Sequence, residues 1–160
     1  MRSKKGESEV DEKWMRLALE QAARAAQLGE VPVGAVAVRD GMIIGTGFNR
    51  KESDQDPTAH AEVLAMRRAA RYVANWRLIG VTLYCTLEPC PMCAGAMIQG
   101  RLQHLVYGAA DTRFGADGTV IQVLNEPAFN HRVQVSSGVL AEEAGDLLQR
   151  FFRRLRDEKM

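Results

Sequence analysis

Hydrophobic residues recur at helical spacing in three stretches of the chain. In residues 11–28 they line one side of a helix, and Gly29 behind them is a typical stop. Asp56-Pro57 favours a helix start, and the helical pattern after it continues to Val73. A third stretch, residues 140–156, places Leu and Phe side chains along one face. The pattern therefore predicts three amphipathic helices.

Alternation of branched apolar residues with small or polar ones is typical of β-strands and marks five shorter segments. These are residues 33–38, 42–47, 81–87, 104–108 and 132–136. The first two flank Asp40-Gly41, a dipeptide that tolerates the positive φ angles of a tight turn, so they are expected to form an antiparallel hairpin. A helix from Pro91 to Gly100 separates the third and fourth, which predicts a parallel right-handed crossover.

These elements predict an α/β protein with a three-layer α/β/α fold, in which a mixed central sheet of about five strands carries helices on both faces. Residues 109–130 are expected to form a long loop with one helical turn near residues 120–124. Residues 1–10 are charged and poor in apolar side chains, so they are expected to be flexible. Residues 11–160 then form a single domain, because 160 residues with 46% hydrophobic content suffice for one core but not for two.

Charge and cysteine content narrow the class of protein. The net charge of +1 argues neither for nor against a nucleic-acid partner, although arginines gather in residues 67–71 and 150–156. No apolar run approaches the ~20 residues that cross a bilayer, so no membrane association is expected. The odd number of cysteines, three, and the polar N-terminal stretch indicate reduced thiols and a cytoplasmic location.

Two short motifs contain the candidate chemistry, His60-Ala61-Glu62 and Pro89-Cys90-Pro91-Met92-Cys93. Cys90 and Cys93 are three positions apart at a predicted helix start, so both sulfurs can bind one ion. A helix N-terminus also lowers the pKa of a thiol and favours its anionic form. With His60 as third ligand, one position of a tetrahedral Zn²⁺ stays free for water, which is typical of a catalytic rather than a structural zinc site.

Glu62 is the candidate catalytic residue. Because it follows His60 by two positions on a helix, it does not share the ligand direction, but it can reach the water that a zinc ion would bind. Zinc lowers the pKa of such a water from about 16 to near 7 in favourable sites, and Glu62 would carry its proton. Cys85 falls on the same strand face as Leu83 and Leu87, which predicts a buried apolar role rather than ligation.

Beyond these motifs, longer blocks resemble the zinc-dependent cytidine deaminase superfamily and, within it, the bacterial tRNA-specific adenosine deaminases. The His-x-Glu and Pro-Cys-x-x-Cys pair is the general signature of the zinc deaminases. The blocks with the finer resemblance are residues 31–36, Phe48-Asn49-Arg50, residues 56–62, residues 86–90, residues 92–98, Asn130-His131-Arg132 and Phe151-Phe152-Arg153. The resemblance extends from about Trp14 to Arg156.

The resemblance implies a cytidine-deaminase-like fold and a homodimer with one Zn²⁺ per subunit. It also implies hydrolysis of adenosine to inosine at the wobble position of a tRNA anticodon stem-loop, with Glu62 carrying the proton from water to N1 of adenine. By the same resemblance, Asn49 and Ala61 bind the base. The flanking anticodon nucleotides would be contacted by Asp111, Arg113, Asn130 and Phe152, with Arg113 standing where Lys is expected.

Two other functions use the same motifs. A deaminase of a free nucleobase, nucleoside or nucleotide would have the same zinc site with another pocket, and a noncatalytic RNA-binding module stabilised by zinc would not need Glu62.

Single residues also have simpler explanations. Asn49 could be a turn residue after a strand, and Phe152 could be part of the core. Glu88 either anchors the metal-binding loop through backbone N–H groups or is an ordinary carboxylate at a strand end.

Overall fold

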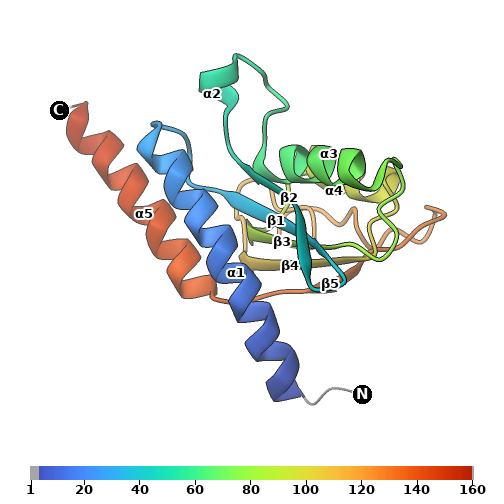
Figure 1. Ribbon diagram of the computed structural model, residues 1–160. Helices are drawn as coiled ribbons and strands as arrows, with labels where there is room; N and C mark the ends of the chain where they lie inside the picture. Colours follow the sequence, from blue (N-terminus) through green and yellow to red (C-terminus); the bar gives the residue numbers. More distant parts are fainter. Residues whose placement is uncertain (1–3, 160) are drawn as a thin grey trace.

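A computed structural model describes residues 4–159 and shows one five-stranded sheet with helices on both faces (Figure 1). The strands are β1 (Gly34–Arg39), β2 (Met42–Phe48), β3 (Thr82–Leu87), β4 (His104–Ala109) and β5 (Gln134–Ser136). Their order across the sheet is β2-β1-β3-β4-β5. β1 is antiparallel to β2 and β3, whereas β3, β4 and β5 run parallel to one another. The sheet is therefore mixed, which confirms the predicted α/β/α fold.

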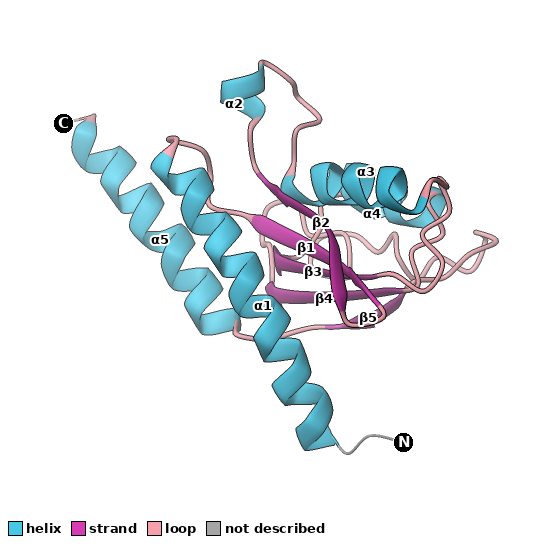
Figure 2. Cartoon of the chain, in the orientation of Figure 1, coloured by secondary structure: helices cyan, strands magenta, loops and turns pink. Residues whose placement is uncertain are grey.

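The described residues form five helices: α1 (Lys4–Gln27), α2 (Lys51–Asp54), α3 (Ala61–Val73), α4 (Pro91–Gln99) and α5 (Ala141–Glu158). Figure 2 shows α1 and α5 together on one face, and α3 and α4 on the other. Strand alternation divides the core between these two layers. Val36, Tyr84 and Val106 pack with residues of α1, while Leu83 and Cys85 belong to the larger cluster under α3 and α4. The predicted burial of Cys85 is thus confirmed.

The local structure agrees with the hydrophobic pattern at most element boundaries and differs at three places. Asp40 and Gly41 have φ angles of 52° and 72°, as the predicted hairpin turn requires. α1 begins at Lys4, seven residues before the expected helix start at residue 11. Of residues 1–10, which were expected to be flexible, the first three lie outside the described residues. The predicted helical turn near residues 120–124 is wrong, because Gln122 pairs with Asp117 in a β-bridge. α2 was not predicted.

No helix in the described part of the chain is long and apolar enough to cross a membrane.

Glycines on β2 allow α3 to lie unusually close to the sheet. A Cβ atom added to Gly45 would lie 2.4 Å from the carbonyl oxygen of Ala65, and one added to Gly47 would lie 2.4 Å from that of Ala61. Both contacts are with helix backbone, which cannot turn away as a side chain can. The position of α3, and of the residues at its N-terminus, therefore depends on the absence of side chains at Gly45 and Gly47.

Gly45→Ala is expected to lower the free energy of unfolding by about 1 to 3 kcal/mol, because α3 must shift to admit the methyl group. Gly145→Ala is a matched control, since no heavy atom lies within 4 Å of its added Cβ and it lies inside α5. That change should stabilise the protein by up to about 1 kcal/mol. Urea unfolding of both variants measures the difference, and equal effects would show that α3 does not depend on the close approach.

Candidate active site and metal centre

Two helix N-termini meet beside the carboxyl end of β3. His60 caps α3 and Cys90 caps α4, each with extended backbone, and Pro91 occupies the first turn of α4. His60 therefore immediately precedes the first turn in which the sequence places it, while Glu62 lies inside that turn. The two motifs, 30 residues apart, face each other across the edge of the sheet.

The three predicted ligands come together at distances that suit zinc. Nδ1 of His60 lies 3.6 Å from Sγ of Cys90 and 3.5 Å from Sγ of Cys93. All three atoms lie within 4.8 Å of one another. A Zn–N bond of about 2.0 Å and a Zn–S bond of about 2.3 Å at the tetrahedral angle would separate nitrogen from sulfur by about 3.5 Å. This group could therefore bind a metal ion without rearrangement of the backbone.

The two thiols differ in acidity because they interact with each other. A hydrogen bond with Cys93 lowers the pKa of Cys90 to about 4, and His60 adds to this effect against the cost of burial. The same hydrogen bond and burial raise the pKa of Cys93 far above its ordinary value. The pKa of His60 is raised, chiefly by its hydrogen bond with Cys90. The centre thus forms one thiolate readily, and metal binding would displace the protons that remain on Cys93 and His60.

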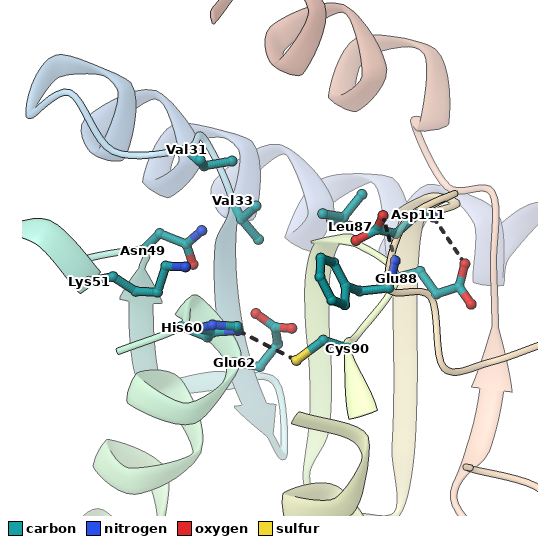
Figure 3. Close-up of a pocket in the computed structure, with 11 residues that line it drawn as sticks. Val31, Val33, Asn49, Lys51, His60, Glu62, Leu87, Glu88, Cys90 and Asp111 are labelled. Atoms are coloured by element: carbon teal, nitrogen blue, oxygen red, sulfur yellow. Dashed lines mark hydrogen bonds between the residues drawn. The ribbon is translucent and has the colours of Figure 1, made fainter. Parts of the chain in front are cut away.

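Glu62 lies beside this group without belonging to it. Figure 3 shows its carboxylate between His60 and Cys90, directed into a pocket. The side chain is only 4% exposed. Burial disfavours the charged carboxylate and raises the pKa of Glu62 above its ordinary value. A buried carboxyl group with a raised pKa, next to a candidate metal centre, is suited to accept and return a proton near neutral pH.

The pocket has a volume of about 350 Å³, at the lower end of the range for small-molecule sites. Its lining consists of Val31, Val33, Asn49, Lys51, His60, Glu62, Leu87, Glu88, Cys90, Asp111 and Phe114. Apolar side chains form part of the wall, Glu62 lies between His60 and Cys90, and Glu88 and Asp111 lie together apart from them (Figure 3). Lys51 and Phe114 were not predicted. Both lie beyond the motifs, on α2 and on the loop after β4, where no local sequence signal indicates the direction of a side chain.

Asn49 is held in one orientation. Its Oδ1 accepts a hydrogen bond from the backbone N–H of Ala61 at 2.9 Å. Because that partner is a donor, the oxygen must face Ala61, and the Nδ2 amino group is left for other acceptors. Asn49 directly follows β2, as a turn residue would, and also lines the pocket as the resemblance implies.

Two buried carboxylates fix the loops around the pocket. Glu88 accepts backbone N–H bonds from Asp111 at 3.0 Å and Asp117 at 2.8 Å, together with the hydroxyl of Thr119. Burial raises the pKa of Glu88, but these hydrogen bonds outweigh burial and hold it below its ordinary value. Glu88 is therefore an anchor through backbone N–H groups, although the segment that it holds is the loop after β4 rather than the metal-binding turn.

Glu30 is the second of these carboxylates and holds α2 in place through hydrogen bonds. Its carboxylate accepts the backbone N–H of Glu52 at 3.2 Å and both the N–H and the hydroxyl of Ser53 at 2.7 Å. Burial opposes ionisation here too, yet the hydrogen bonds keep the pKa of Glu30 below its ordinary value. This contact spans more than twenty residues and explains why a four-residue helix forms in a stretch without a hydrophobic pattern.

The remaining predicted RNA-contacting residues lie around the pocket rather than in it. The guanidinium of Arg113 stands 5.8 Å from the ring centroid of Phe152, and neither residue lines the pocket. Phe152 is half-buried and also makes an edge contact with Phe151, so it belongs partly to the core. Asn130 lines a different cavity, together with Gln99 and other residues of α4 and of the loops that follow it. The roles of these three residues stay predictions.

Comparison with known proteins places the chain in a family. A model of the MafB19-like deaminases matches residues 9–156. The tRNA-specific adenosine deaminase of Haemophilus influenzae is 50% identical over 160 residues, covering 99% of this chain and 92% of the relative. The enzyme of the same name from Bacillus subtilis is 48% identical over 149 residues, covering 93% and 92%.

Solved structures show the same relationship. A structure from a study of A-to-I editing by tRNA:A34 deaminases at the wobble position has a TM-score of 0.82 at 40% identity, covering 85% of this chain and 99% of that one. A guanine deaminase from Nitrosomonas europaea has a TM-score of 0.76 at 25% identity, covering 88% and 83%. The chain thus has a cytidine-deaminase-like fold and belongs to the MafB19-like deaminases, in the family of the tRNA-specific adenosine deaminases.

Proposed function

We propose that this deaminase hydrolyses adenosine to inosine at the wobble position of tRNA anticodons. The observation that carries the proposal is the buried Glu62 carboxylate beside the group His60, Cys90 and Cys93, at the base of a pocket of about 350 Å³. Relatives that share up to half of the residues of this chain are tRNA-specific adenosine deaminases, which favours adenosine in tRNA as the substrate.

His60, Cys90 and Cys93 would hold one Zn²⁺ per subunit, and the ligand spacing supports this choice of metal. When bound, zinc activates a water molecule for attack on C6 of adenine. Glu62 would take one proton from that water and deliver it to N1, and would then pass the second proton of the same water to the departing amino group. Water is consumed, the C6–N bond breaks, and ammonia leaves.

The pocket walls would hold the base in place for this transfer. Asn49 presents its Nδ2 donor, because its oxygen is bound to Ala61, so it is suited to an acceptor atom on the purine. Val33 and Leu87 offer apolar surface to the ring faces. An anticodon loop base can be splayed from its neighbours at modest cost, which suits a recessed pocket of this kind.

Contacts with the flanking nucleotides would involve Asp111, Arg113, Asn130 and Phe152. Asp111 lines the pocket itself. Arg113 and Phe152, which contact each other, offer a positive charge and an aromatic ring. Proteins commonly use both features to bind single-stranded RNA. A tRNA substrate and three unpaired thiols are both consistent with a cytoplasmic location, which we also propose.

A homodimer is supported by an apolar groove between α3 and α4. The groove is lined by Val63, Met66, Arg67, Ala70, Trp76, Leu78, Ala96 and Gly100. Trp76, one of these lining residues, is 55% exposed in the single chain. Large exposed aromatic side chains next to an apolar groove are typical of protein interfaces. A second copy of this chain is the occupant that the resemblance implies.

A deaminase of free nucleobases is the second candidate, because the Nitrosomonas europaea guanine deaminase has the same fold. The wild-type protein should convert adenosine to inosine in an anticodon stem-loop, whereas adenosine, cytidine and guanine in free form should release little or no ammonia. Sequencing of the RNA, in which inosine is read as guanosine, and an ammonia assay measure the two outcomes. Ammonia from the small molecules alone would contradict the tRNA proposal.

Glu62→Gln serves as the control in this experiment, because it removes the proton carrier but keeps the size of the side chain. Inosine formation should fall by a factor of about 10² to 10⁴ or more. Zinc content, measured by atomic absorption, and RNA affinity should stay close to those of the wild type. Unchanged activity in this variant would favour a mechanism without Glu62, and no activity in either protein would favour a noncatalytic RNA-binding module.

Glu88→Gln should loosen the pocket wall formed by the loop after β4, because the amide places a donor against backbone N–H groups. The expected loss in the free energy of unfolding is about 1 to 3 kcal/mol, and amide hydrogen exchange should rise in residues 111–119. Glu20→Gln makes the same charge change at an exposed position of α1 and should change stability by less than about 0.5 kcal/mol. Similar exchange rates in both variants would contradict the anchoring role.

Trp76→Glu should convert the homodimer to monomers, because a charge would be buried in the interface. Light scattering should give twice the mass of one chain for the wild type and one chain for the variant. Leu28→Glu changes another exposed apolar residue, just after α1, and should leave the dimer intact. A monomeric wild-type protein, or a Trp76→Glu variant that stays dimeric, would rule out this groove as the interface.

A further inference from the structure

Three arginines from separate loops meet at the amino ends of the parallel strands. Arg77 comes before β3, Arg101 before β4 and Arg132 before β5. They line a cavity of about 360 Å³ together with Ile79, Gln103 and His131. We call this cavity the arginine pocket. Successive arginines of this set are 24 and 31 residues apart in the sequence, and the parallel arrangement of β3, β4 and β5 brings them together.

The arginine pocket contains no carboxylate among its lining residues. In the described part of the chain the ion pairs within 4.0 Å are Arg39–Asp40 and Arg50–Asp54, and neither includes an arginine of this pocket. Positive charges that converge without an acidic partner repel one another, which costs stability unless an anion is bound. The lining of the arginine pocket therefore indicates a negatively charged ligand.

Neighbouring groups orient the side chains of the arginine pocket, and most of the guanidinium N–H groups stay available as hydrogen-bond donors. The guanidinium of Arg77 lies 4.4 Å from the ring centroid of Trp76. Nη1 of Arg101 donates to the carbonyl oxygen of Ile98 at 2.9 Å, which uses one of its five N–H groups. Nε2 of His131 lies 2.7 Å from the carbonyl oxygen of Leu102, so the ring is also fixed. A planar guanidinium fits phosphate with two parallel hydrogen bonds, and several such groups lie around one cavity here.

The arginine pocket and the candidate active site lie at opposite ends of the same strands. Cys90 follows the carboxyl end of β3, while Arg77 and Ile79 precede its amino end. Six residues of strand, at about 3.3 Å each, separate the two ends by about 20 Å. A nucleoside bound at Glu62 does not reach that far. The anion must therefore belong either to a second molecule or to a distant part of a long substrate.

We propose that the arginine pocket binds a backbone phosphate of the RNA substrate, outside the anticodon nucleotides that surround the target base. Arg77, Gln103 and Arg132 are exposed, so the pocket opens to solvent as a site for a polymer requires, whereas pockets for small metabolites enclose most of the ligand. A phosphate contact of this kind adds affinity without sequence preference. The proposal rests on RNA being the substrate and assigns the contact that distinguishes a long RNA from a short one.

The test uses the double variant Arg77→Ala/Arg132→Ala in the full chain and leaves Arg101, which holds a backbone carbonyl, in place. Dissociation constants are measured for a full tRNA, an anticodon stem-loop and a loop oligonucleotide without the stem, at several salt concentrations. For tRNA and the stem-loop, affinity should fall by about tenfold or more, and the salt slope should decrease by about 0.7 to 0.9 for each lost phosphate contact. Affinity for the loop oligonucleotide should not change.

Lys13→Ala/Arg16→Ala is the matched control, because it removes two exposed basic residues on α1, neither of which lines the pocket, and gives the same net charge. It should keep the tRNA affinity and the salt slope of the wild type. Deamination of the loop oligonucleotide by both double variants shows that the candidate active site is intact. Failure of the wild type to form inosine in any RNA would count against the proposed function, whereas the binding measurements are independent of turnover.

Four results would overturn the proposal for this pocket. These are equal RNA affinities of the two double variants, an equal loss for the loop oligonucleotide, a change from dimer to monomer in the Arg77→Ala/Arg132→Ala variant alone, and calorimetric binding of pyrophosphate that depends on the pocket while RNA binding does not. The third would assign the arginines to subunit assembly, and the fourth would assign them to a small phosphorylated ligand.

Discussion

The structure depends on the fixed spacing of two helix N-termini at one edge of the sheet. An imidazole on α3 and two thiols on α4 must lie about 3.5 Å apart to share a tetrahedral ion, and each helix is positioned separately by its packing on the sheet. Gly45 and Gly47 allow α3 to approach β2 closely, and α4 follows β3 with a turn that begins at Pro89. The candidate metal centre is therefore a property of the whole core and not of the two motifs alone.

Three buried glutamates show how the environment separates structural from chemical roles. Glu30 and Glu88 accept several hydrogen bonds from backbone N–H groups and hydroxyls, which favour the ionised form and lower the pKa of each. Both then act as permanent anions that fix loops. Glu62 is equally buried, but burial outweighs its few hydrogen bonds, and its pKa is raised. A carboxyl group that fixes a loop must stay ionised, whereas a proton carrier, the role proposed for Glu62, must bind and release a proton, and the local donors favour one state or the other.

Much of the fold could be predicted from the chain because its signals are local. Helical and strand periodicity indicate the mixed sheet and its two covering layers, and the motifs at His60 and Cys90 bring their ligands together. Features that depend on distant contacts could not be predicted. α2 forms because Glu30 binds it from another segment, and Phe114 reaches the pocket because Glu88 holds its loop. Arg77 joins two other arginines only through the order of the parallel strands.

The two ends of the parallel strands suit different parts of one substrate. Proton transfer needs a buried group with an altered pKa, and Glu62 on α3 lies in the pocket with Cys90, which follows the carboxyl end of β3. Binding of a polyanion needs exposed, permanent charge, and arginine keeps its charge at every physiological pH. Separation by about 20 Å keeps the arginine charges from shifting the proton equilibria at Glu62. A substrate that spans both ends would be selected by its length at one end and by its base at the other, so the proposed deamination can be restricted to RNA.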